Sequence, residues 1–176
     1  MTNIIMHGCG GKMGRVIAEL VQNDADCKIV AGIDPTTPAM DFPVFASVQE
    51  CNVPADVIID FSTATAVDAL LDFAKEKQIP VVVCTTALSD ATQSKLEETA
   101  KQVAVLKSAN MSIGINLLLD LVARAAQILY DANFDIEVVE KHHNQKIDAP
   151  SGTAKKRKTG TYRNRNACDS RRKYCR

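Results

Sequence analysis

Short runs of valine and isoleucine alternate with longer amphipathic stretches through the first 110 residues of this 176-residue chain. Strands that alternate with helices form βαβ units, and such units build a parallel sheet. The runs are nearly continuous in apolar residues, as expected for strands covered by helices on both faces. The sequence therefore predicts an α/β fold with a Rossmann-like parallel sheet. The expected strands are residues 4–6, 28–33, 57–60, 81–83 and 103–106, with a short one near 44–45.

Helical spacing predicts helices at residues 12–22 and 64–77, and a third beginning at Ser89. After residue 110 the pattern changes to a long apolar-faced helix at 113–130, followed by period-two alternation at 134–138. Alternation indicates a strand covered on one face only, so this strand is expected to open a different sheet. We therefore expect a first domain at residues 1–110 and the start of an incomplete α+β second domain at residues 111–154.

A glycine-rich turn follows the first expected strand. Residues 7–14 read His-Gly-Cys-Gly-Gly-Lys-Met-Gly, and the spacing GxxGxxG fits Gly8, Gly11 and Gly14. Such a turn at the start of a helix lets backbone N–H groups approach a pyrophosphate. Glycine-rich turns also occur for packing reasons, so the motif alone is weak. Its place between a strand and a helix favours a dinucleotide-binding domain.

Asp34 stands at the end of the second strand, twenty residues after Gly14. An acid there can accept hydrogen bonds from the ribose hydroxyls of a dinucleotide. The alternative is a carboxylate that caps the turn before Pro35. A carboxylate repels the 2′-phosphate of NADP, and no arginine follows to hold that phosphate. NADH is therefore slightly favoured over NADPH.

Two histidines and a lysine gather in the segment Glu140–Ala154. Neighbouring histidines on an extended chain point to opposite sides, so no metal site is expected. Imidazolium and ammonium groups can neutralise carboxylates and supply a proton. Backbone N–H groups at residues 151–153 can bind a carboxylate where a helix begins. A surface loop with an ordinary helix cap is the alternative, and the residues alone leave both open.

The segment resembles the signature of the dihydrodipicolinate reductase family, E-x-H-H-x-x-K-x-D-A-P-S-G-T-A. The positions that match are Glu140, His142, His143, Lys146 and the run 148–154. The glycine turn, Asp60-Phe61-Ser62 and residues 108–116 are similar to further motifs of this family, in the same order. The resemblance covers residues 3–154.

This resemblance implies a reductase of lysine and diaminopimelate biosynthesis. Such an enzyme transfers a hydride from NADH or NADPH to dehydrated 4-hydroxy-tetrahydrodipicolinate, a small cyclic dicarboxylate, and gives tetrahydrodipicolinate. The family is homotetrameric. A departure from the family occurs at Cys84, where a glycine is usual before two threonines. It bears on how closely the backbone approaches the nicotinamide.

The resemblance also implies roles for individual residues. His142 would be the acid–base residue and Lys146 a second proton donor. The substrate would be bound by His143, Ser151, Gly152 and Thr153, with Lys146. The cofactor would be bound by Gly8, Cys9, Gly10, Gly11, Lys12, Met13, Asp34, Cys84, Thr85, Thr86, Ser108, Ala109, Asn110 and Met111.

Residues 155–176 differ from the rest of the chain. They hold 10 of its 21 basic residues and one of its 21 acidic residues, and they lack Leu, Ile, Val, Met and Phe. Such a segment cannot bury enough apolar surface to offset the cost of ordering it, so we expect a disordered tail outside the family pattern. A truncation or reading-frame shift after Ala154 is the favoured explanation. A genuine nucleic-acid-binding tail and a neutral extension are the alternatives.

Three functional hypotheses therefore remain: a reductase, an inactive nucleotide-binding remnant, and a basic-tailed nucleic-acid-binding protein. For this chain we expect weak or no reductase activity, because the strand expected at 134–138 lacks sheet partners and residues 151–153 lack the helix that they would begin. Apolar stretches long enough to span a membrane are not expected, and no secretory signal is visible at the N-terminus. The six cysteines are scattered without a CxxC pair, which is typical of free thiols in a reducing compartment. We expect a cytoplasmic location with no membrane association.

Overall fold

The computed structural model of the chain describes residues 1–136. It divides into two units, Met1–Ser108 and a second unit that begins at Ala109. The division falls two residues before the boundary expected between residues 110 and 111. The two units are described separately below, the second over its residues 109–136.

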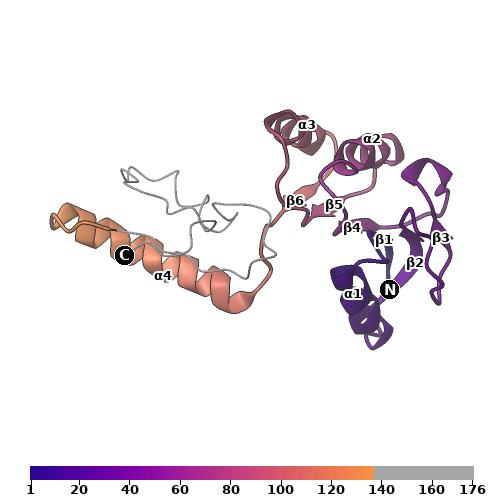
Figure 1. The fold of residues 1–176 in the computed structure, drawn as a ribbon, viewed down its shortest axis with the longest axis horizontal. Coiled ribbons are helices and arrows are strands. Elements are labelled where there is room, and N and C mark those ends of the chain that lie inside the picture. Colours follow the sequence, from indigo (N-terminus) through magenta and orange to yellow (C-terminus); the bar gives the residue numbers. More distant parts are fainter. Residues whose placement is uncertain (137–176) are drawn as a thin grey trace, which may run out of the picture. The chain divides into compact units, whose positions relative to one another are not determined.

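The first unit contains six parallel strands in the order β3-β2-β1-β4-β5-β6 (Figure 1). This is the doubly wound order of dinucleotide-binding domains, in which the chain starts in the middle of the sheet and builds outward in both directions. The predicted α/β fold with a parallel sheet is confirmed. The strands are β1 (Thr2–His7), β2 (Cys27–Ile33), β3 (Val44–Phe45), β4 (Val57–Asp60), β5 (Val81–Val83) and β6 (Val105–Lys107).

Helix α1 (Lys12–Gln22) lies on one face of the sheet, and α2 (Val67–Lys77) and α3 (Asp90–Ala100) lie on the other (Figure 1). A short 3-10 helix, η1 (Val48–Glu50), precedes β4. Helix α3 begins after Ser89 as predicted, because the Ser89 hydroxyl accepts a hydrogen bond from the backbone N–H of Thr92. Helix α2 begins three residues later than expected, because residues 63–66 form a turn closed by a hydrogen bond from the Ala66 N–H to the Thr63 carbonyl.

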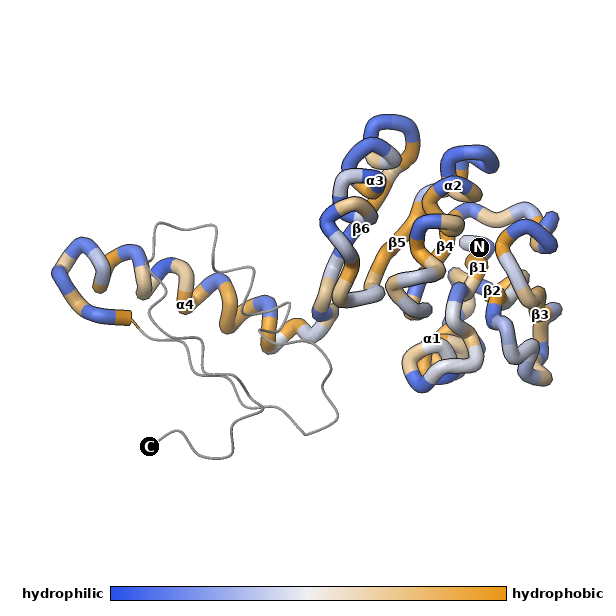
Figure 2. Tube along the Cα trace, turned by 45° about the horizontal axis from the view of Figure 1, so that its top comes forward, coloured by the Kyte–Doolittle hydropathy of each residue, from blue (hydrophilic) through white to orange (hydrophobic). Residues whose placement is uncertain are grey.

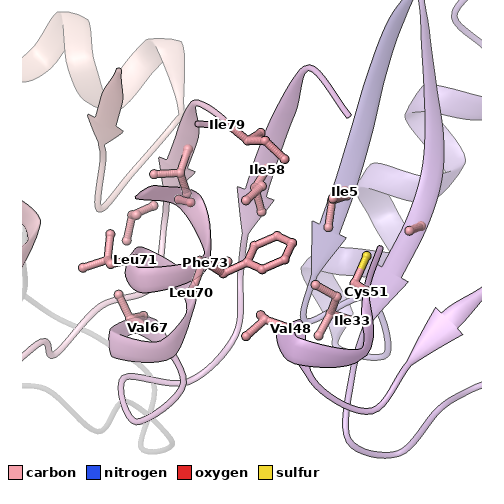
Figure 3. Packing of buried hydrophobic residues seen from close by; sticks show 14 of the residues in the cluster. Ile5, Ile33, Val48, Cys51, Ile58, Val67, Leu70, Leu71, Phe73 and Ile79 are labelled. Carbon is pink, nitrogen blue, oxygen red and sulfur yellow. The ribbon is translucent and has the colours of Figure 1, made fainter. Parts of the chain in front are cut away.

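Strand residues alternate between two hydrophobic clusters, one on each face of the sheet. Ile5 and Ile58 point into the cluster beneath α2, into which Phe73 also projects (Figure 3). Ile4 and Met6 point to the opposite face, toward the inner side of α1. Figure 2 shows the same distribution, with apolar strands inside and polar residues on the outer sides of the helices. The first unit therefore buries both faces of its sheet, as the continuous valine and isoleucine runs predict.

The last strand, β6, begins two residues later than expected. Val103 was predicted to belong to it, but its N–H donates to the carbonyl of Thr99. This hydrogen bond continues the end of α3, and the Val103 side chain is buried. Val103 therefore buries its side chain without forming part of the strand.

The described part of the second unit is dominated by one helix, α4 (Ile113–Asp131). The Ser112 hydroxyl caps its first turn by accepting from the N–H of Ile115 at 3.4 Å. At the other end the Phe134 N–H donates to the carbonyl of Leu129, so the chain folds back on the helix instead of extending. The predicted strand at 134–138 is therefore wrong for Phe134–Ile136, and residues 137–138 lie outside the described residues.

Helix α4 is long and apolar enough, by length and composition, to cross a membrane. This corrects the expectation that no apolar stretch approaches that length. A core helix of a water-soluble protein can have the same length and composition. The helix also carries an ion pair between Asp120 and Arg124 at 3.1 Å, and charges inside a bilayer are costly.

Candidate functional site

The carboxyl ends of the central strands bring the predicted cofactor-binding segments of the first unit together. Backbone hydrogen bonds join neighbouring ends: Phe61 N–H donates to the His7 carbonyl at 3.0 Å, and Cys84 N–H donates to the Asp60 carbonyl at 2.9 Å. Connections leave β1 and β4 toward opposite faces of the sheet, because α1 and α2 lie on opposite faces (Figure 1). In open α/β sheets, ligands bind at this point, where the strand order reverses.

The glycine turn after β1 is tightly packed against the loop after β4. Gly8 has a φ of +79°, and a Cβ there would lie 2.6 Å from the carbonyl oxygen of Phe61. A Cβ on Gly14 would collide with the carbonyl oxygen of Gly8, because α1 starts close against the turn. A Cβ on Gly11 would have more room, because its nearest neighbour, the Gly8 carbonyl oxygen, would lie 3.3 Å away. Gly8 and Gly14 are therefore required by packing, whatever the turn binds.

The first turn of α1 presents backbone N–H groups that helices leave without intrahelical partners. Gly11 occupies the N-cap position, and within the described residues no side chain caps this helix. The Arg15 Nε donates to the carbonyl of Gly10 at 3.1 Å, which places a guanidinium beside the turn. Uncapped N–H groups, the positive end of the helix dipole and a nearby cation favour an anion here.

Asp34 follows β2 and is buried beside the glycine turn. Its Oδ2 accepts from the Gly10 N–H at 2.9 Å, and its Oδ1 accepts from the N–H and the hydroxyl of Thr36 at 3.0 and 2.6 Å. Burial by itself would raise the pKa of Asp34, but these hydrogen bonds and the nearby His7 hold the pKa below its usual value. Asp34 thus caps the turn that follows it, which was the alternative to cofactor binding. Through the hydrogen bond from Gly10, the same carboxylate also holds the glycine turn.

A buried histidine and a buried carboxylate meet where β1 and β4 end. The Nδ1 of His7 lies 2.9 Å from Oδ1 of Asp60, which is fully buried. An ionised carboxylate can only accept, so Nδ1 carries the hydrogen. The same Oδ1 accepts from the N–H of Ser62 at 3.1 Å and from its hydroxyl at 2.6 Å. Burial would raise the pKa of Asp60, but the hydrogen bonds from His7 and Ser62 hold it below its usual value.

The threonine turn after β5 approaches this carboxylate. Thr85 lies close enough to help lower the pKa of Asp60. Within the described residues, however, neither the Thr85 hydroxyl nor Oδ2 of Asp60 forms a hydrogen bond of normal geometry, although both are buried. Cys84 is buried beside them, and burial together with the charge of Asp60 raises the pKa of its thiol to about 11. The Cys84 side chain therefore stays a neutral thiol and is no nucleophile near pH 7.

The predicted cofactor-binding residues 108–111 cross the division between the two units. Ser108 ends the first unit, where its N–H donates to the Val83 carbonyl at 3.1 Å. In the second unit, Oδ1 of Asn110 accepts from the Ser112 N–H at 2.8 Å, and the Asn110 carbonyl accepts from the side chain of Asn116 at 3.1 Å. Asn110 thus shapes the turn that precedes α4.

The predicted catalytic and substrate-binding residues lie outside the described residues. They are His142, Lys146, His143, Ser151, Gly152 and Thr153. Among residues 1–136, no group of three His, Cys, Asp or Glu side chains could hold a metal ion. The structure therefore describes the cofactor half of the predicted site.

His7 and Ser62 were not predicted as site residues. A usable signal existed, because His7 directly precedes the glycine turn and Asp60 ends a buried strand. Two polar side chains at the ends of adjacent buried strands must find partners, and in a parallel sheet those ends share an edge. The partner of each side chain can be identified only when the order of the strands is known.

Two family models match the chain. One is described as "Dihydrodipicolinate reductase, N-terminus" and matches residues 2–111; the other is described as "Dihydrodipicolinate reductase, C-terminus" and matches residues 114–173. The chain belongs to the dihydrodipicolinate reductase family. The second match extends beyond residue 154, after which the family pattern was expected to end. Where that pattern ends stays a prediction.

Curated relatives agree with this assignment to the dihydrodipicolinate reductase family. The 4-hydroxy-tetrahydrodipicolinate reductase of Clostridium novyi is 49% identical over 155 residues, which are 88% of this chain and 61% of the relative. The protein of the same name from Caldanaerobacter subterraneus is also 49% identical, over 154 residues, with the same coverage. The chain therefore spans about 61% of the length of these relatives.

Solved structures show the same fold. A dipicolinate-bound dihydrodipicolinate reductase from Paenisporosarcina sp. TG-14 matches with a TM-score of 0.69 and 29% identity, over 89% of this chain and 63% of that one. A myo-inositol dehydrogenase from Corynebacterium glutamicum matches with a TM-score of 0.53 and 20% identity, over 70% of this chain and 41% of that one. The second likeness shows the fold alone.

We predict that Gly8→Ala destabilises the first unit by about 2–4 kcal/mol, because a Cβ at positive φ would also meet the Phe61 carbonyl. Gly114→Ala is the matched control, since its Cβ would have only the Ser112 hydroxyl in reach, at 3.9 Å, and alanine favours a helix. Urea unfolding followed by circular dichroism measures both. Equal stability of Gly8→Ala and the parent chain would contradict the packing described for the turn.

We also predict that the free energy of unfolding decreases in acid. The pKa values of Asp34 and Asp60 are lower in the folded state, so their contribution is complete above the ordinary aspartate pKa of about 3.9. It is lost as the pH falls below that value through the folded pKa values. Urea midpoints between pH 7 and pH 3 test this, and Asp34→Asn should show a shallower decrease in acid. An unchanged slope in that variant would contradict the role given to Asp34.

Proposed function

We propose that this protein is a 4-hydroxy-tetrahydrodipicolinate reductase of lysine and diaminopimelate biosynthesis. Membership in the family carries the proposal, since both family models and the curated relatives point to the same enzyme. The reaction would transfer a hydride from NADH or NADPH to the dehydrated substrate and give tetrahydrodipicolinate. A related solved structure with dipicolinate bound supports a small cyclic dicarboxylate as the ligand class.

The geometry of the first unit supports a dinucleotide at the carboxyl edge of the sheet. The pyrophosphate would contact the turn Gly8–Met13, where N–H groups of α1 are uncapped and Arg15 adds positive charge. The adenosine ribose would lie near Asp34, whose Oδ2 accepts one hydrogen bond from the described residues, from the Gly10 N–H. The remaining contacts would come from Thr85, Thr86 and residues 108–111.

We propose a preference for NADH over NADPH, on the basis of Asp34. Its pKa is lowered, so the carboxylate is charged at neutral pH. A charge beside the ribose repels a 2′-phosphate, and the residues that follow, Pro35, Thr36 and Thr37, offer no cation to offset it. The hydrogen bonds from Gly10 and Thr36 also hold the carboxylate in place, so it cannot easily turn away from that phosphate.

The chemistry on the substrate would come from residues 140–154. His142 would exchange the proton that accompanies reduction, with Lys146 as the second donor. His143 and the backbone at Ser151–Thr153 would bind the substrate carboxylates. When bound, the nicotinamide supplies the hydride. We further propose a cytoplasmic enzyme without membrane association.

Turnover and binding assays on the purified chain test this proposal together. We expect NADH to bind, with a change in its fluorescence, and to be oxidised only weakly when the dihydrodipicolinate substrate is present. Lys146→Ala should lower kcat while the dissociation constant of NADH stays within about twofold. Binding without turnover in the parent chain would favour an inactive nucleotide-binding remnant. Salt-sensitive oligonucleotide binding without NADH binding would favour the basic-tailed alternative.

The nucleotide preference has its own test. We predict that Asp34→Ser shifts the ratio of the NADPH and NADH dissociation constants by about tenfold toward NADPH, since it removes the repulsion of the 2′-phosphate. Asp41→Ser is the matched control, because Asp41 is an exposed acid of the loop after β2. Fluorescence titrations at one ionic strength measure both ratios. An equal shift in the two variants would indicate a general charge effect and contradict the assignment.

A further inference from the structure

His7 and Asp60 form a buried polar pair at the carboxyl ends of β1 and β4. His7 is the last residue of β1 and Asp60 the last of β4, and the two are direct partners in the sheet register. Their side chains are 7% and 0% exposed. Burial of a carboxylate costs free energy through lost hydration, and hydrogen bonds such as the one from His7 offset part of that cost.

The Asp60 carboxylate joins segments that are separate in the sequence. Its Oδ1 accepts from His7, which leads directly into the glycine turn, and from Ser62 in the loop after β4. The threonine turn after β5 lies beside it, held by the hydrogen bond from Cys84 to the Asp60 carbonyl. Two of these three turns, the glycine turn and the threonine turn, hold residues that the proposed cofactor would contact.

Close packing transmits any movement of this network to the glycine turn. The Cβ position of Gly8 is filled by the Phe61 carbonyl, so the loop after β4 and the turn after β1 cannot shift independently. His7 directly precedes Gly8, so its hydrogen bond to Asp60 also holds the start of the glycine turn.

We propose that His7 and Asp60 are positioning residues that fix the glycine turn against the loops after β4 and β5 in the geometry that binds the cofactor. The inference rests on the proposed function for its effect on binding. The coupling of the three turns through the Asp60 carboxylate can be measured without any cofactor. Neither residue touches the reacting atoms in this account.

Three variants separate the hydrogen bond from the volume of the histidine. His7→Leu fills the space but removes the donor, whereas His7→Asn keeps an N–H close to the position of Nδ1. Thr99→Val is the matched control, because Thr99 is fully buried, its hydroxyl donates to the Lys95 carbonyl at 2.8 Å, and it lies at the end of α3 that leads to the start of β6. It removes a buried hydrogen bond at the opposite edge of the sheet.

Hydrogen exchange on the full chain without cofactor is the first test. For His7→Leu we expect amide exchange about tenfold faster at residues 8–14 and 61–63, while α3 is unchanged. His7→Asn should restore most of the protection, and Thr99→Val should leave residues 8–14 as in the parent chain. Should His7→Leu fail to fold, Ser62→Ala removes the 2.6 Å hydroxyl bond alone and should show the same local pattern. Unchanged exchange at residues 8–14 would overturn the proposal.

NADH titration is the second test. We expect the dissociation constant to rise about tenfold in His7→Leu, and to stay within about threefold in His7→Asn and twofold in Thr99→Val. Equal affinities in His7→Leu and the parent chain would overturn the positioning role. Failure of the parent chain to bind NADH would instead contradict the proposed function, while the exchange result would still decide whether the pair fixes the turn.

Discussion

The contact between the glycine turn and the loop after β4 is the constraint on which the rest of the site depends. Gly8 can lie against the Phe61 carbonyl only because it lacks a side chain and can adopt a positive φ. This contact sits between β1 and β4, where the connections diverge to opposite faces of the sheet. The start of α1, Asp34 and the ends of β4 and β5 lie at this edge of the sheet, where the proposed cofactor would bind.

Much of the first unit could be predicted because its strands are buried on both faces. Continuous valine and isoleucine then show directly in the sequence, and β4 (Val57–Asp60) and β5 (Val81–Val83) are predicted to the residue. The errors occur at ends, where local hydrogen bonds decide. Val103 bonds back to α3, and the turn at Thr63 delays α2. In the second unit, the bond from Phe134 to Leu129 replaces the expected extended backbone.

The candidate site could be predicted only in part, because its residues differ in what reveals them. The glycines and Asp34 follow from spacing along the chain, and the structure brings them together through the hydrogen bond from Gly10 to Asp34. The pairing of His7 with Asp60 depends on which strands are neighbours, and spacing does not contain that information. The predicted catalytic residues His142 and Lys146 lie beyond the described residues, so their role stays a prediction.

Backbone amide shifts in an NMR titration with NADH test the central claim most directly, because they locate the ligand on the chain. Binding at the carboxyl edge predicts the largest changes at residues 8–13, at Asp34 and at residues 84–86. The amino edge, where β4 begins at Val57 and β5 at Val81, should stay unchanged. Saturable changes that spare the glycine turn and gather at the amino edge would contradict the account.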